Sequence, residues 1–194
     1  MNACESILGL SPYQGGKPIE ELARELGLKK ITKLASNENP LGVSEVVKNA
    51  INTSLSNINR YPDGNCFDLK KAISDKLSVN PNMISLGNGS NELLELIARV
   101  FVSTKADEII FSEYAFVVYP LVTQALGATA MISPAKNYGH DLSSMLSLIN
   151  KNTKLIFVAN PNNPTGTLLT NDELYSFLNE VPNEIPVVSD QAYF

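Results

Sequence analysis

The chain has 194 residues, a length that allows one full domain and part of a second. Its composition, 44% hydrophobic and 18% charged, indicates a globular protein and excludes a disordered or fibrous chain. Its net charge of −5 argues against a nucleic-acid partner, and no apolar run reaches the roughly 18 residues that a membrane span needs. With no secretory signal pattern, and with two cysteines too few for a disulfide scaffold, we expect a cytoplasmic protein without nucleic-acid or membrane partners.

The first eighty residues are predicted to form three amphipathic helices joined by polar loops. The helices are expected over residues 18–26, 44–55 and 68–77, and the loops include residues 36–42 and 60–64. This part of the chain contains no internal repeat. It is typical of a helical arm that leads to a sheet, rather than of an independent core.

From Met83 onward, short β-type runs alternate with segments of helical periodicity. The predicted strands are Met83–Gly87, Glu108–Ser112, Thr129–Ser133, Leu155–Asn160 and Ile185–Ser189. The predicted helices are Asn91–Val102, Phe116–Leu126, Asp141–Ile149 and Thr170–Val181, the last opening with the capping-box pair Thr170 and Glu173. This alternation predicts an α/β fold, in which right-handed crossovers build a mostly parallel sheet with helices on both faces.

The last predicted strand has no crossover helix after it. Phe194 lies only four residues beyond Asp190, so a sheet that ends there leaves its last elements partly uncovered. We therefore expect the chain to be an N-terminal fragment of a longer protein.

Polar or turn-rich segments follow four of the predicted strands. They are Gly87–Asn91, Ser112–Phe116, Asn160–Gly166 and Asp190–Phe194. In an open parallel sheet, ligands bind beyond the carboxyl ends of the strands. We therefore expect the topology to bring several of these segments together around one crevice.

The segment after the first strand has the features of an anion site. Its glycines allow a close approach of the backbone, and the N–H groups of Ser90 and Asn91 at a helix start favour a phosphate. An ordinary turn with a Ser or Asn cap explains the segment equally well. Glu92 stands where a third glycine is expected, so the segment is not the dinucleotide fingerprint.

Three further side chains at strand ends suit an aromatic, charged ligand. Two prolines stiffen the loop that carries Asn163, which can therefore aim its amide at a ligand. Asp190 ends a strand, and a buried carboxylate there needs a cationic partner unless it caps the next helix. The sequence has no cluster of His or Cys residues that would bind a metal ion. A protonated heterocycle is therefore the better partner for Asp190. Phe116 can lie flat on a ring, whereas Tyr119 is expected in the core and His140 on the surface.

In their order along the chain, these segments resemble those of the fold-type I aminotransferases, which use pyridoxal 5'-phosphate. The resemblance rests on Gly89-Ser90-Asn91-Glu92, on Phe116 and Tyr119, on Asn163-Pro164-Thr165-Gly166 and on Asp190-Gln191-Ala192-Tyr193. Two further segments, Leu34–Gly42 and Arg60–Gly64, are similar to those of the histidinol-phosphate aminotransferase branch. The resemblance implies an N-terminal arm with a small-domain contribution over 1–43, and the first part of the large cofactor-binding domain over 44–194, with its remainder missing.

The resemblance also implies how the cofactor is held. Ser90 and Asn91 bind its phosphate, and Phe116 stacks on the pyridine ring, where relatives often carry Tyr. Asp190 pairs with the ring nitrogen and keeps it protonated, which makes the ring an electron sink.

Roles for five more residues follow from the same resemblance. Asn163 and Tyr193 hydrogen-bond the phenolic oxygen of the cofactor. Tyr61 reaches the cofactor phosphate of a partner subunit, which implies a homodimer of the full-length protein. Asn39 and Gly42 belong to the loop that borders the substrate.

The implied reaction is the transfer of an amino group between L-glutamate and imidazole-acetol phosphate, a phosphorylated keto substrate of histidine biosynthesis. The Schiff-base lysine of the family lies beyond the Asp190 strand, whereas the last lysine of this chain is Lys154. We therefore expect that this chain contains no catalytic residue and does not transaminate by itself. Alternatives remain open: a threonine-phosphate decarboxylase, an aromatic aminotransferase, a non-catalytic phosphate- or nucleotide-binding module, or a degenerate reading frame without a stable product.

Overall fold

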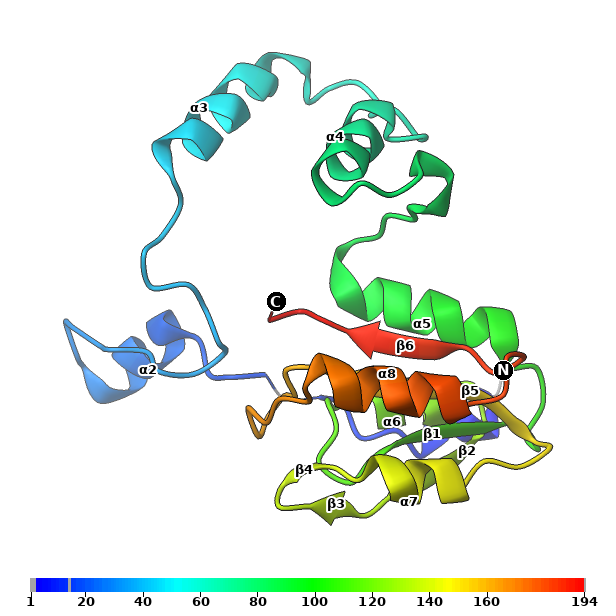
Figure 1. Cartoon of the computed structure of the whole chain (residues 1–194). Helices are drawn as coiled ribbons and strands as arrows, with labels where there is room; N and C mark the ends of the chain where they lie inside the picture. Colours follow the sequence, from blue (N-terminus) through cyan, green and yellow to red (C-terminus); the bar gives the residue numbers. More distant parts are fainter. Residues whose placement is uncertain (1–2, 14, 194) are drawn as a thin grey trace. The chain divides into compact units, whose positions relative to one another are not determined.

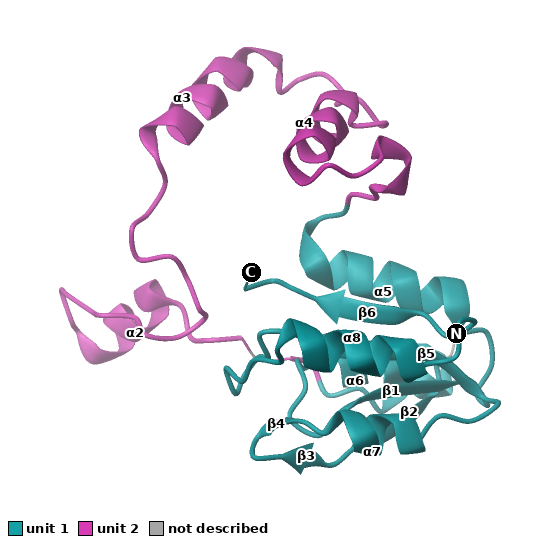
Figure 2. Ribbon diagram, viewed as in Figure 1, with its two compact units in different colours: residues 1–11, 87–194 teal, residues 12–86 magenta. Residues whose placement is uncertain are grey.

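The computed structural model describes residues 3–13 and 15–193, and the chain divides into two compact units (Figure 2). Unit 1 comprises Met1–Ser11 and Gly87–Phe194, and unit 2 comprises Pro12–Leu86. The predicted division of the protein at residue 43 stays a prediction.

Unit 1 is built on a four-stranded parallel sheet in the order β2-β1-β5-β6 (Figure 1). The strands are β1 (Glu108–Ser112), β2 (Thr129–Ser133), β5 (Thr153–Ala159) and β6 (Val187–Asp190). The predicted bounds of β1 and β2 are confirmed, and β5 and β6 lie within two residues of their predicted positions. The predicted α/β fold with a mostly parallel sheet is therefore confirmed.

Helices cover both faces of this sheet because consecutive residues in its central strands, Ile109–Phe111 of β1 and Leu155–Ala159 of β5, are apolar and buried. On β1, Ile109 and Phe111 pack into one cluster with α5 (Gly89–Phe101) and α6 (Val118–Ala125). Ile110, between them, points to the other face and packs with α7 (Leu142–Ser147) and α8 (Asn171–Glu180). Strands that alternate between two buried faces are the signature of a parallel sheet inside an α/β layer structure.

Side-chain caps fix where two of these helices begin. The Asp141 carboxylate accepts a hydrogen bond from Ser144 N–H at the start of α7. Thr170 and Glu173 form the predicted capping box at the start of α8, each side chain accepting from the backbone N–H of the other. These caps satisfy N–H groups that have no partner within the helix.

Three short elements of unit 1 were not predicted. α1 spans Glu5–Leu8, and the Ser6 hydroxyl donates to the carbonyl of Ala125 at 3.2 Å. β3 (Ala135–Lys136) and β4 (Gly139–His140) form an antiparallel hairpin between β2 and α7.

The predicted strand Met83–Gly87 is wrong. Pro81–Met83 forms the 3-10 helix η2, and among the described residues no strand pairs with the segment from Ile84 to Gly87. A strand needs a neighbour for its N–H and C=O groups, and a short apolar run does not supply one by itself.

Unit 2 is helical, as predicted. It contains α2 (Ile19–Leu26), α3 (Glu45–Ser54), η1 (Leu55–Asn57), α4 (Phe67–Leu77) and η2 (Figure 1). Gly27 ends α2 with φ of 64°, in the left-handed region that glycine adopts readily. None of the described residues of unit 2 is buried, so its helices lack a core of their own.

Two observations concern the described residues of both units. No helix among them has the length and apolar character of a membrane span. Nor do three or more His, Cys, Asp or Glu side chains gather there into a group that would hold a metal ion.

Candidate functional site

A small cavity of about 70 Å³ lies where β5 and β6 end. Its lining contains five of the residues singled out from the sequence, namely Ser90, Phe116, Asn163, Asp190 and Tyr193, together with Ala159, Pro161 and Ala192. The structure thus brings together residues from all four predicted strand-end segments. Phe194, the last residue of one segment, lies outside the described residues.

Asp190 is held at the cavity by both backbone and side-chain hydrogen bonds. Its carbonyl oxygen accepts from Asn160 N–H at 2.9 Å, which ties the end of β6 to the end of β5. The Oδ2 atom accepts from the Tyr119 hydroxyl at 2.9 Å, and Oδ1 accepts from Ala192 N–H at 3.2 Å. The carboxylate is therefore oriented before any ligand binds.

The Tyr119 hydroxyl acts as a permanent donor in this pair. The side chain is fully buried, and burial of the phenol together with the nearby Asp190 carboxylate raises the pKa of Tyr119 far above its ordinary value. The phenol keeps its proton across the physiological range. The carboxylate of Asp190 is accordingly the acceptor.

Aromatic rings fix the position of Tyr119. Its ring stacks on Phe157 with centroids 4.6 Å apart and planes at 11°. Phe116 meets it edge-on at 6.0 Å, and Phe111 lies 6.4 Å away. Such contacts between rings add to the burial of apolar area, so Tyr119 has little freedom to move.

The sequence prediction for Tyr119 was incomplete. The residue is in the core, as expected, but its hydroxyl reaches the site. Tyr119 lies in the first turn of α6, and Phe116 precedes the helix by two residues; their rings are in contact. The closeness of Tyr119 to Phe116 in the sequence is the signal that could have placed it beside the cavity.

Asn163 and Tyr193 form a second polar group of the cavity. The Asn163 side-chain amide donates to the Tyr193 hydroxyl at 2.9 Å. This bond joins residues 30 positions apart in the sequence, so both polar groups are presented at one place.

Two other asparagines, which the sequence analysis did not single out, stiffen the loop that carries Asn163. Asn160 makes two hydrogen bonds to the backbone of Leu169, and Asn162, only 3% exposed, donates to the carbonyl of Tyr114 at 2.9 Å. The density of asparagine between residues 160 and 163 is the sequence feature that points to these bonds.

The start of α5 has the geometry of an anion site. Asn88 is the N-cap but makes no side-chain capping hydrogen bond, so it leaves the first-turn N–H groups of Ser90 and Asn91 without a side-chain cap. Gly89 has φ of 79°, and a Cβ atom there would meet nothing within 4 Å. Ser90 lines the cavity, whereas Asn91 is exposed beside it.

Three predicted site residues belong to unit 2. The Asn39 side chain accepts from Leu41 N–H at 2.9 Å, and Gly42 has φ of 75°. Tyr61 is fully exposed. The roles of these three residues stay predictions.

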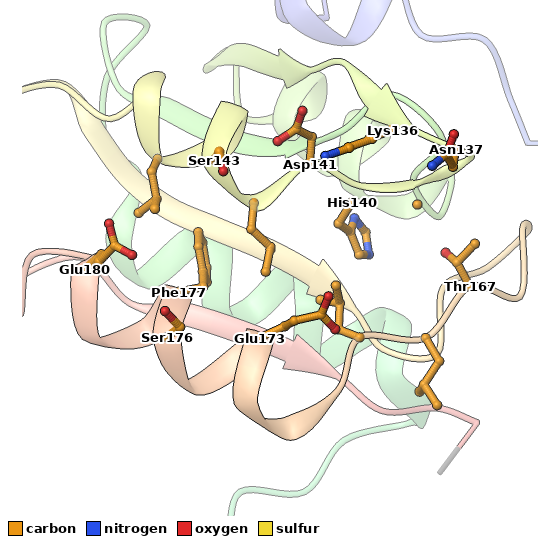
Figure 3. Close-up of a pocket in the computed structure, with 15 residues that line it drawn as sticks. Lys136, Asn137, His140, Asp141, Ser143, Thr167, Glu173, Ser176, Phe177 and Glu180 are labelled. Carbon is orange, nitrogen blue, oxygen red and sulfur yellow. The ribbon is translucent and has the colours of Figure 1, made fainter.

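A larger cavity of about 610 Å³ lies between the β3–β4 hairpin, α7 and α8 (Figure 3). Its charged lining includes Lys136, Asp141, Glu173 and Glu180, and it contains none of the residues predicted for the site. The small cavity remains the candidate site, because it lies at the carboxyl ends of parallel strands and joins an aromatic ring, a carboxylate and a helix start.

His140 lies in the larger cavity and was wrongly expected on the surface (Figure 3). It is half-buried, and its Nε2–H donates to the carbonyl of Ala159 at 2.8 Å. Burial lowers the pKa of His140, and the bond to Ala159 offsets only part of this effect. The imidazole is therefore neutral near pH 7.

Comparisons of the sequence point to one family. The family "Aminotransferase class I and II" matches residues 29–194. A protein named histidinol-phosphate aminotransferase 1, from Mannheimia succiniciproducens, is 60% identical over 187 residues, which cover 96% of this chain and 51% of that relative. Histidinol-phosphate aminotransferase 2 of Haemophilus influenzae is 56% identical over 191 residues, covering 98% of this chain and 52% of the relative.

Solved structures agree with this result. Histidinol-phosphate aminotransferase from Sinorhizobium meliloti, in complex with pyridoxal-5'-phosphate, superposes with a TM-score of 0.86 at 25% identity, over 97% of this chain and 50% of that one. Aspartate aminotransferase from Thermus thermophilus, with maleate, gives 0.84 at 20% identity and shows the shared fold alone. This chain spans about half the length of the relatives that it matches. On the match over residues 29–194, the chain belongs to the class I and II aminotransferase family.

Proposed function

We propose that this chain binds pyridoxal 5'-phosphate in the small cavity and contributes that site to a histidinol-phosphate aminotransferase. The observation that carries the proposal is the meeting of Ser90, Phe116, Asn163, Asp190 and Tyr193 around one cavity. The names of the relatives that are 56–60% identical support the choice of enzyme.

The residues present fit this cofactor group by group. A phosphate suits the start of α5, where backbone N–H groups and the Ser90 hydroxyl donate to an anion. Phe116 offers a flat apolar face to the ring, and the Asn163–Tyr193 pair offers polar hydrogens to its phenolic oxygen. Asp190 supplies the one carboxylate of the lining, which suits a protonated ring nitrogen.

The chain's own residues then orient the cofactor and hold a proton. A carboxylate beside the ring nitrogen favours the protonated form of that nitrogen, because opposite charges stabilise each other. When bound, pyridoxal phosphate supplies the electron sink for chemistry at the substrate α-carbon. Asn163 and Tyr193 would bind the phenolic oxygen, so the ring would be held at a second position besides its nitrogen.

The wider activity belongs to the same proposal. The amino group moves between L-glutamate and imidazole-acetol phosphate in a homodimer, where Tyr61 reaches the partner's cofactor and Asn39 and Gly42 border the substrate. None of the residues that line the cavity is a lysine, and no lysine follows Lys154 in the sequence. We therefore propose that the chain by itself binds the cofactor without a covalent bond and does not transaminate.

A titration of the chain with pyridoxal phosphate, followed by absorbance and tyrosine fluorescence, tests this proposal. We expect saturable binding that weakens at least about tenfold in Asp190→Asn, because a charge-assisted hydrogen bond is lost. Asp172→Asn, at an exposed position of α8, is the control and is expected to bind like the unchanged chain. Reduction with sodium borohydride is expected to label no single lysine selectively.

Two results would contradict the proposal. One is binding of pyridoxal phosphate that Asp190→Asn leaves unchanged. The other is saturable binding of NAD or ATP with none of pyridoxal phosphate, which would favour a nucleotide-binding module.

A further inference from the structure

We propose that Tyr119 is a positioning residue that holds the Asp190 carboxylate toward the ring nitrogen of bound pyridoxal phosphate; this inference rests on the proposed function. The hydrogen bond from the Tyr119 hydroxyl to Asp190 Oδ2 is 2.9 Å long and joins residues 71 positions apart. This hydrogen bond connects α6 with the last residue of β6.

The surroundings of Tyr119 suit a fixed donor. Its side chain is completely buried, and the stack on Phe157 holds the ring in the plane from which the hydroxyl reaches Asp190. A buried hydroxyl without a partner costs free energy, so the bond to Asp190 is needed in the folded state as well as useful to a ligand.

Asp190 has acceptor capacity left after this bond. A carboxylate has about four lone-pair positions, and the described contacts of its side chain are one bond from Tyr119 and one from Ala192 N–H. Both bonds come from donors, so the remaining positions suit a further donor, such as a protonated ring nitrogen. The pair of bonds fixes the orientation of the carboxylate and leaves its negative charge for the ligand.

Tyr119 also links two walls of the cavity. Phe116, the lining residue that would lie on the cofactor ring, meets the Tyr119 ring edge-on at 6.0 Å. One side chain thus contacts both the aromatic wall and the carboxylate. We expect a change in its hydroxyl to affect the carboxylate while leaving the aromatic wall in place.

Tyr119→Phe removes the hydroxyl and keeps the ring. We expect the affinity for pyridoxal phosphate to fall about tenfold, because the carboxylate is then no longer oriented before the ligand binds. With pyridoxal phosphate labelled with ¹⁵N in the ring, the nitrogen resonance is expected to move toward that of a neutral pyridine, because the carboxylate is less well oriented to stabilise the protonated form. Tyr175→Phe, at an exposed position of α8, is the control and is expected to change neither measurement.

A double-mutant cycle separates positioning from a general effect on the fold. If Tyr119 acts through Asp190, Tyr119→Phe weakens binding in the unchanged chain but has almost no further effect in Asp190→Asn. Equal effects of Tyr119→Phe in both backgrounds would overturn the inference. So would an unchanged ¹⁵N resonance.

The unchanged chain gives a measurement that does not depend on how the variant folds. The Tyr119 hydroxyl proton, recognised in the NMR spectrum by its slow exchange with water, is expected to shift when pyridoxal phosphate is added. A resonance that does not move would overturn the inference. Absence of any binding by the unchanged chain would overturn the proposed function and this inference together, whereas binding that depends on Asp190 but not on Tyr119 would overturn the inference alone.

Discussion

Asn162 and Asp107 show how single polar side chains hold unit 1 together. Asn162 is 3% exposed and its amide donates to the carbonyl of Tyr114 and to the Thr165 hydroxyl. Asp107, just before β1, accepts from the N–H groups of Ser103 and Thr104, and these bonds lower the pKa of its carboxyl. In both cases a side chain satisfies main-chain groups that the strands and helices leave unpaired.

His140 makes the stability of the chain depend on pH at the scale of one residue. Because its pKa is lowered in the folded state, the stability that the neutral imidazole contributes is present above the ordinary pKa of about 6.5 and is lost as the pH falls below it. We expect the free energy of unfolding, measured with urea, to fall between pH 7 and pH 5.5 by at most about 1.4 kcal/mol per pH unit.

His140→Gln is the matched variant for this prediction. The chain has one histidine, so the variant removes the imidazole titration altogether. Its free energy of unfolding is expected to change much less between the same two pH values. An equal change in the variant and the unchanged chain would show that another group is responsible.

At the scale of elements, β5 is a strand that contributes buried side chains to the core clusters on both faces of the sheet. It lies between β1 and β6, and Leu155, Phe157 and Ala159 face one core cluster while Ile156 and Val158 face the other. Its residues carry no turn signal until Asn160, which is why its end was predictable from the sequence to within one residue.

Leu155→Ala tests how much the buried side chains of β5 contribute to the free energy of unfolding. Leu155 is fully buried, so we expect a loss of about 2–5 kcal/mol in the free energy of unfolding, from the lost transfer of apolar atoms and the cavity left behind. Leu168→Ala removes the same atoms from a side chain that is 68% exposed and is expected to change stability by less than about 0.5 kcal/mol. Similar losses in chemical denaturation of the two variants would contradict the assignment of β5 to the core.

At the scale of the whole molecule, the two units differ in how much they bury. Unit 1 contains both core clusters, whereas the apolar residues of α3 in unit 2, among them Val46, Val47 and Ile51, are about half or more exposed. A helix of ten residues without tertiary packing is marginal in water. The stability of the chain is therefore expected to be uneven.

Hydrogen exchange followed by mass spectrometry measures this difference. We expect the amides of α3 to exchange orders of magnitude faster than those of β5. The helix α5 is the matched control, because it is also amphipathic but buries Leu94 and Ala98, and its amides are expected to exchange slowly. Equal protection of α3 and α5 would contradict the prediction.

The sequence alone determined the class of fold, most element bounds and the family. These features depend on neighbours in the chain: the apolar runs of β1 and β5, the Thr170–Glu173 capping box and the motifs around Ser90, Asn163 and Asp190.

Only the tertiary structure decided what those residues contact. The order β5-β6 and the path of α6 bring Tyr119 to Asp190 across 71 positions, and no pattern along the chain specifies that hydrogen bond. The same reason explains the error at Met83–Gly87, since its composition suits a strand but a strand forms only where a neighbour pairs with it. Local patterns set what each segment can become, and the packing of distant segments selects which of those possibilities is realised.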